Sequence, residues 1–115
     1  MPSRRLFGKT NFEIKKSSMT NQTLTVVAKI EAKTLFREKV KKELFELISP
    51  TLAENGCINY DLHQDYTDKN VFLFYENWES HLLWLEHNDS EHIAKYQKAT
   101  KGCIESFEIF EMSKL

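Results

Sequence analysis

The feature that most constrains the fold of this chain is an eight-residue segment, Val71–Trp78, that is apolar in both of its alternating positions. Side chains of a β-strand point to opposite faces in turn. One face of this segment would carry two phenylalanines and a tryptophan, and the other a valine, a leucine and a tyrosine. If the segment is a strand, both faces need burial, and its sheet needs a cover on each side.

Two strands and one helix are predicted before this segment. Leu24–Glu31 alternates between apolar and more polar positions, which indicates a strand. Thr34 is suited to cap a helix with one apolar stripe, and Pro50 is expected to end it. After a turn at Asn55–Gly56, alternation returns over Cys57–Asp65, the second predicted strand. The apolar residues predicted on one face of this second strand are Ile58, Tyr60 and Leu62.

A broken helix and a final strand are predicted after the third strand. Ser80 is expected to cap a helix that runs to about His87, and Ser90 to cap a second piece that Gly102 ends. Cys103–Met112 is apolar on both sides and is the fourth predicted strand. The order strand, helix, two strands, broken helix, strand is that of an α+β, ferredoxin-like βαββαβ fold with an antiparallel sheet.

Helices in this order cover one face of the sheet and leave the other face without a partner. An uncovered apolar sheet face would exceed the apolar patch that a monomer usually exposes. A second copy related by a two-fold axis would supply a second sheet, so the sequence predicts a homodimer. The alternative is that the polar N-terminal segment folds across the open face.

Length and composition favour one soluble domain. A chain of 115 residues has room for one hydrophobic core. Residues 1–21 are basic and polar and are expected to form a flexible extension, with the domain at 22–115. The net charge of −1 and the lack of a long apolar run argue against nucleic acid or membrane partners. Two widely spaced cysteines, Cys57 and Cys103, fit a reduced, cytoplasmic protein.

Candidate chemistry lies in a cluster of aromatic and histidine side chains. His92 falls in the first turn of a helix, where the helix dipole favours a neutral imidazole that can accept a proton. His63 shares a strand face with Asp61, which could orient it, so His63 is a second candidate base. Simple core packing is the alternative for the aromatic residues, and an exposed strand end is the alternative for His63.

Motifs for metals and cofactors are absent from the sequence. The intervals between His81, His87 and His92 do not return to one helical face, so no metal site is predicted. With three glycines in the chain, no glycine-rich phosphate or dinucleotide loop is present. We therefore expect no cofactor.

Several short motifs together resemble one known family. Gly56-Cys57, Tyr60-Asp61-Leu62-His63, the run from Phe74 to Ser80 and Ser90-Glu91-His92 are similar to the antibiotic biosynthesis monooxygenase domain. The resemblance extends from about Leu24 to Leu115. It implies a ferredoxin-like homodimer whose two sheets join into a barrel, in agreement with the burial argument.

The resemblance also implies a function, cofactor-free oxidation of a small phenol or quinol by dioxygen in a pocket between sheet and helices. His63, Trp78 and Trp84 match pocket positions of the family's oxygenases, whereas Phe74 departs from them, because they carry a polar amide there. We expect His63 and His92 to be catalytic and the substrate to contact Tyr60, Phe74, Glu76, Trp78, Trp84, His87 and Tyr96.

Two other functions remain open at this point. The first is isomerisation of a small phosphorylated sugar, as in another branch of the same family. That reaction would need a cation in the pocket, and Lys95, Lys98 and Lys101 are the candidates. The second is a dimeric binding or stress-response protein that performs no reaction.

Overall fold

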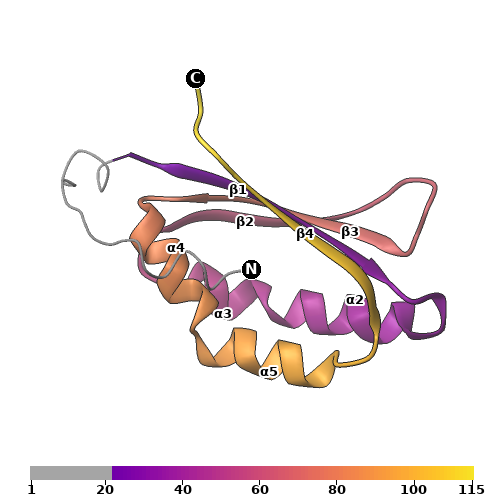
Figure 1. The fold of residues 1–115 in the computed structure, drawn as a ribbon. Coiled ribbons are helices and arrows are strands. Elements are labelled where there is room, and N and C mark those ends of the chain that lie inside the picture. The colour runs from indigo at the N-terminus through magenta and orange to yellow at the C-terminus, as the bar shows by residue number, and fades with distance from the viewer. Residues whose placement is uncertain (1–21) are drawn as a thin grey trace.

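The computed structural model describes residues 22–115 and places helices against one face of an antiparallel sheet (Figure 1). The predicted extension, residues 1–21, lies outside the described residues. The strands are β1 (Leu24–Ala32), β2 (Cys57–Gln64), β3 (Val71–Trp78) and β4 (Ile104–Met112), in the order β2-β3-β1-β4. The helices are η2 (Thr34–Phe36), α2 (Arg37–Glu46), α3 (Ile48–Leu52), α4 (His81–Asn88) and α5 (Glu91–Ala99). The predicted ferredoxin-like α+β fold is therefore confirmed.

Local signals explain the ends of most elements. The hydroxyl oxygen of Ser80 accepts a hydrogen bond from the backbone of Leu83, and that of Ser90 accepts one from Ile93, so both predicted caps are present. Gly102 follows α5 with φ of 82°, in the left-handed region that ends helices.

Two predictions about the first helix were wrong. Thr34 makes no capping bond, because the helical segment begins with the 3-10 turn η2 and Thr34 is its first residue. The Thr34 hydroxyl oxygen instead accepts a hydrogen bond from the Asn70 side-chain amide. Pro50 does not end the helix but lies inside α3. The helical path breaks at Leu47, so Pro50 falls in the first turn of a new helix, where its missing N–H leaves no bond unmade.

The helix-facing side of the sheet forms the hydrophobic core. Val26 and Ile30 of β1 and Phe72, Phe74 and Trp78 of β3 are fully or almost fully buried there. The prediction that Ile58 lies on the same face as Tyr60 and Leu62 was wrong. The pairing of β2 with β3 shifts between Cys57 and Asn59, and this bulge leaves Ile58 51% exposed.

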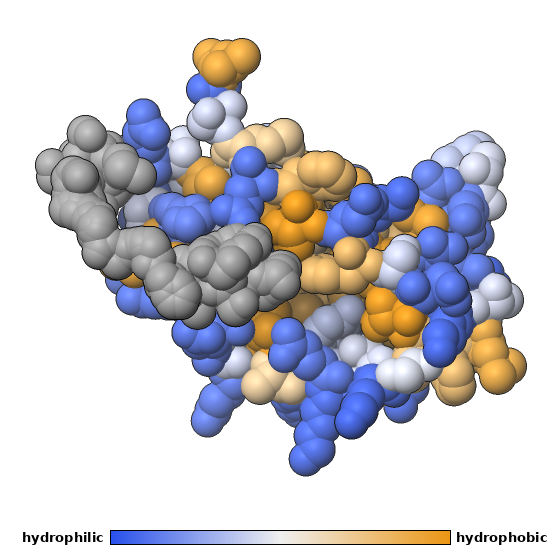
Figure 2. All heavy atoms as spheres, viewed as in Figure 1, coloured by the Kyte–Doolittle hydropathy of each residue, from blue (hydrophilic) through white to orange (hydrophobic). Residues whose placement is uncertain are grey.

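The opposite face of the sheet is apolar in part and is left open by the described residues. Tyr75 of β3 and Phe110 and Met112 of β4 keep between 43% and 46% of their surface exposed. Figure 2 shows hydrophobic side chains gathered along β4. No helix among residues 22–115 is long and apolar enough to cross a membrane.

Candidate functional site

A small cavity of about 80 Å³ lies between the sheet and the helices. Most of its lining is apolar and comes from β1, α2, β3, α5 and β4. Such a cavity, apolar with a few convergent polar groups, is typical of small-molecule sites. The lining residues that carry a polar atom on the side chain are Tyr60, Glu76, His87, Tyr96 and Gln97.

Three polar side chains meet at one edge of this cavity. His87 Nδ1 lies 2.7 Å from Glu54 Oε2, and His92 Nε2 lies 2.5 Å from the same oxygen. A carboxylate oxygen only accepts hydrogen bonds, so each imidazole donates from the nitrogen named. In His87 this tautomer leaves Nε2 as the acceptor of the ring. Of the three residues, His87 is the one that lines the cavity.

These three side chains come from separate elements. Glu54 stands in the turn between α3 and β2, His87 in the last turn of α4 and His92 in the first turn of α5. The two helices are separated by Asp89 and Ser90, and this break changes the direction of the chain, so that both imidazoles reach one carboxylate. The arrangement is visible only once the fold is known.

Burial distinguishes the members of this cluster. The side chain of His87 is 3% exposed, whereas Glu54 and His92 keep 16% and 22%. Burial lowers the pKa of His87, and the hydrogen bond and charge of Glu54 oppose part of that shift. His87 is therefore held as a buried imidazole that is oriented by a partly solvated carboxylate.

Glu76 is a second ionisable group in the cavity wall. It is 3% exposed, and its Oε1 accepts a hydrogen bond of 2.9 Å from the indole nitrogen of Trp78. Burial raises the pKa of Glu76 to about 8, although the bond from Trp78 acts in the opposite direction. Near neutral pH the group is therefore mostly a neutral carboxylic acid, which can donate a proton in a hydrogen bond.

Aromatic rings hold these polar groups in place. The Tyr60 ring stacks on Phe74 with centroids 4.1 Å apart, and the Trp78 ring lies 4.8 Å from that of His87. Burial raises the pKa of the Tyr60 phenol, and it raises that of Tyr96 to about 12. Both phenols consequently stay protonated at neutral pH and can donate to a ligand.

The structure brings only some of the predicted site residues to the cavity. Trp78 lies behind the lining, in contact with Glu76 and His87, while Trp84 packs beside His81. His63 is exposed on the opposite face of the sheet. Its Nδ1 lies 3.1 Å from the backbone oxygen of Asp61, not from the carboxylate. The predicted residues that do line the cavity are Tyr60, Phe74, Glu76, His87 and Tyr96.

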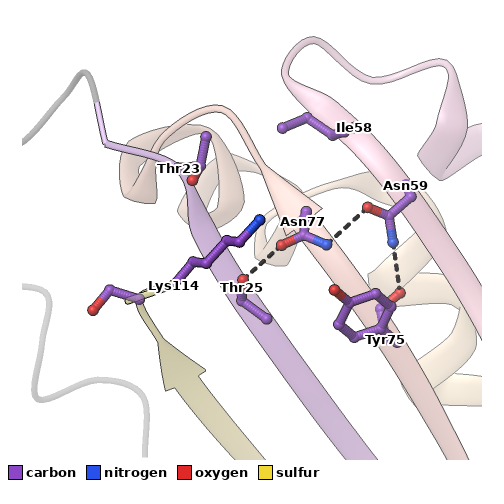
Figure 3. Close-up of a pocket in the computed structure, with 8 residues that line it drawn as sticks. Thr23, Thr25, Ile58, Asn59, Tyr75, Asn77 and Lys114 are labelled. Atoms are coloured by element: carbon purple, nitrogen blue, oxygen red, sulfur yellow. Dashed lines mark hydrogen bonds between the residues drawn. The ribbon is translucent and has the colours of Figure 1, made fainter.

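A wider hollow of about 470 Å³ lies on the open face of the sheet (Figure 3). A chain of hydrogen bonds crosses its floor: the Thr25 hydroxyl donates to Asn77, the Asn77 amide donates to Asn59, and the Asn59 amide donates to the Tyr75 carbonyl. The polar groups of the floor are thus already paired with one another. We regard the smaller cavity near His87, which brings ionisable side chains together, as the better candidate site.

Sequence reasoning missed Glu54 and Gln97. Glu54 precedes the Asn55–Gly56 turn and shows no motif, and its partners stand 33 and 38 residues away. The ligand atoms of Glu54, His87 and His92 lie within 4.8 Å of one another, so this cluster could hold a metal ion. The spacing of the histidines did not predict this, because spacing along one helix says nothing about two helices that meet at an angle.

Comparison with known proteins agrees with this architecture. Rv0793 of Mycobacterium tuberculosis, provisionally named a monooxygenase, is 30% identical over 74 residues, which are 64% of this chain and 72% of that protein. YcnE of Bacillus subtilis, named in the same provisional way, is 29% identical over 69 residues, 60% of this chain and 73% of that protein.

Solved structures show the same fold. The crystal structure of PA3566 from Pseudomonas aeruginosa has a TM-score of 0.79 and 30% identity, covering 84% of this chain and 97% of that one. The sequence model described as antibiotic biosynthesis monooxygenase matches residues 23–99, from the start of the sheet through the last helix. On its sequence and its fold, the chain belongs to the antibiotic biosynthesis monooxygenase family.

Proposed function

We propose that the protein is a cofactor-free monooxygenase that oxidises a small phenol or quinol with dioxygen in the cavity beside His87. The observation that carries this proposal is the buried His87 imidazole, which lines the cavity and is oriented by Glu54. The family and its provisionally named monooxygenases support the reaction type.

In this proposal His87 is the catalytic base. Nδ1 donates to Glu54, so Nε2 is free to take the phenolic proton of a substrate. Glu54 also stabilises the imidazolium that forms, and His92 shares this carboxylate as a positioning residue. His92, predicted from the sequence to be a catalytic base, is thus assigned a positioning role in this proposal, and His87 takes the place of His63, which lies on the other face of the sheet.

The chemistry requires no other reactant. Dioxygen reacts slowly with closed-shell molecules, but a phenolate can transfer one electron to it. The resulting radical pair joins at a ring carbon as a peroxide, which takes up a proton. Loss of water, with departure of the ring C–H hydrogen, then leaves a quinone. The substrate gives up two hydrogens, one oxygen atom enters the product, and the other leaves as water.

The cavity limits the size of the substrate. At about 80 Å³ it is far below the ~300–1,000 Å³ of most ligand sites. A single-ring substrate fits this constraint best, and α5 would need to move outward to admit it. Although α5 contains no fully buried residue, its Ile93 and Tyr96 pack against the core, so this movement has to open those contacts. The protonated Glu76 and the Tyr60 and Tyr96 phenols would then bind the substrate's oxygens.

Oxygen-electrode measurements over a panel of hydroquinones and phenols test the proposal. The chain should be treated with a chelator and assayed without flavin or metal, against the spontaneous rate in buffer. We expect uptake of one dioxygen per substrate without accumulation of hydrogen peroxide. His87→Ala should remove the enzymatic rate, Glu54→Gln should reduce it at least tenfold, and His63→Ala should not change it. An undiminished rate in His87→Ala would refute the assignment of the base.

The two other functions have less support. None of the residues lining the cavity is cationic, and Lys95, Lys98 and Lys101 are exposed. A phosphorylated sugar would therefore lack a counter-charge there. A binding protein without turnover would show stabilisation by phenols but no oxygen uptake in the same assay.

We further propose that two copies pack through their open sheet faces. Tyr75, Phe110 and Met112 are exposed apolar side chains on this face, with Val27 and Leu73 half-buried beside them. Burial of such a face is the usual reason for a two-fold dimer. Sedimentation equilibrium at micromolar concentration should give twice the chain mass, and a monomer would refute this assembly.

A further inference from the structure

Glu54, His87 and His92 offer a carboxylate oxygen and two imidazole nitrogens to one point. Two imidazoles with one carboxylate are a donor set that divalent first-row transition metals bind, whereas magnesium and calcium prefer oxygen ligands. We propose that these three side chains form a site for a divalent transition metal such as zinc, and that its occupation switches off the oxidation proposed above.

The spacing of the three groups suits such an ion after a small adjustment. Zinc lies about 2.0–2.2 Å from nitrogen and oxygen ligands, which places neighbouring ligand atoms of a tetrahedral site roughly 3.4 Å apart. The two histidine to carboxylate distances are now 2.5 and 2.7 Å, and all the ligand atoms lie within 4.8 Å of one another. To reach this spacing the Glu54 carboxylate has to withdraw by less than about 1 Å, and ligand atoms as far apart as 4.8 Å have to approach each other by about 1.4 Å.

The environment permits both entry and retention of a metal. Glu54 and His92 are partly exposed, so an ion can reach the cluster from solvent. Glu54 lies in a turn and not in a helix or strand, so its side chain can shift without disturbing the sheet. His87 is fixed by the rings of Trp78 and Tyr60, with centroids 4.8 and 5.5 Å away. One rigid ligand and two adjustable ones meet at the site.

Metal binding would change which nitrogen of His87 carries the proton. An ion on Nδ1 occupies the lone pair of that nitrogen and requires the tautomer with hydrogen on Nε2. The nitrogen that accepts the substrate proton in the proposed reaction then becomes a donor. The metal-bound and the catalytic states of His87 exclude each other. This inhibitory role rests on the proposed function, whereas metal binding itself does not.

Titration calorimetry of the full chain with zinc chloride, after removal of metals by a chelator, tests the site directly. We expect one zinc per chain, and visible absorption when cobalt replaces zinc. His92→Ala, which removes a ligand, and Glu54→Gln, which replaces an anionic ligand with a neutral amide, should each weaken binding about 100-fold. His81→Ala is the matched control, because its imidazole pairs with Glu111 outside the cluster, and its affinity should equal that of the parent chain. Equal affinity in all three variants, or no binding heat in the parent, would overturn the site.

Oxygen uptake with and without metal tests the inhibitory role. Saturating zinc should abolish uptake, and the same concentration of magnesium should leave it unchanged. If zinc binds at one per chain while oxidation continues, the inhibitory role is refuted and the site stands. If the metal-free chain consumes no oxygen with any substrate, the proposed function fails and the inhibitory role falls with it, but the calorimetric result still decides the metal site.

Discussion

Replacing Glu76 with glutamine should change how the stability of the protein depends on pH. The Glu76 side chain is buried, and glutamine has nearly the same shape and keeps an oxygen that can accept the Trp78 hydrogen bond. The substitution therefore removes an ionisable group with little change in packing. Any pH-dependent difference between the two proteins reports on the carboxyl group itself.

The sign and size of the effect follow from the raised pKa. Glu76 titrates at about 8 in the folded chain, against 4.5 for its ordinary value. Between these two pH values the folded state holds a proton that the unfolded state has released, so the free energy of unfolding falls as pH rises. Between pH 5.5 and 8.5 this one group should reduce the stability of the parent chain by about 3 kcal/mol relative to Glu76→Gln.

Urea unfolding at pH 5.5, 7 and 8.5, with all chains at equal concentration, measures this difference. We expect the urea midpoint of Glu76→Gln, relative to that of the parent chain, to rise by roughly 1–3 M between about pH 5.5 and pH 8.5. Glu79→Gln, which changes an exposed carboxyl group, is the matched control and should track the parent. A constant difference between the parent and Glu76→Gln at all three pH values would contradict the account of Glu76 as a neutral buried acid.

Three further predictions concern the fold and the assembly. Gly56→Ala should lower stability by roughly 2–5 kcal/mol in urea unfolding, because φ is 87° there and an added Cβ would lie 2.3 Å from Leu83 Cδ1; a loss below 1 kcal/mol would disprove the close approach. Ser80→Ala should lower it by about 1 kcal/mol through the lost cap of α4, and an unchanged thermal midpoint would count against that cap. Phe110→Asp should yield monomers in sedimentation equilibrium while Leu82→Asp, at an exposed position of α4, should not; equal behaviour of the two would argue against the open face as the interface.

Local sequence signals predicted the elements well where residues close in sequence decide the structure. The third strand begins at Val71 and ends at Trp78 as predicted, because alternating apolar residues between polar turns leave little choice of register. Ser80 and Ser90 cap their helices because a serine side chain acts on a backbone amide three residues away.

Most of the failures depend on tertiary contacts. The prediction for Ile58 failed because a bulge adds a residue to β2. The alternation of apolar residues does not indicate where the pairing register with β3 shifts. The prediction that Pro50 ends the helix failed for a local reason, because the helical path breaks at Leu47 and a proline is tolerated in the first turn of the new helix. The partnership of Glu54 with His87 and His92 arises from three elements that meet in space, and no spacing along the chain encodes it.

The two residues that separate α4 from α5 set a limit on how this protein can vary. On one continuous helix, positions 87 and 92 would point roughly 140° apart, and no single carboxylate could reach both. Adding or deleting one residue between Asn88 and Glu91 would turn the start of α5 by about 100° and carry His92 away from Glu54. The length of this connection is thus more tightly constrained than its composition. Relatives that keep both histidines but lengthen the link should lack the shared carboxylate, and with it any activity or metal affinity that depends on the pair.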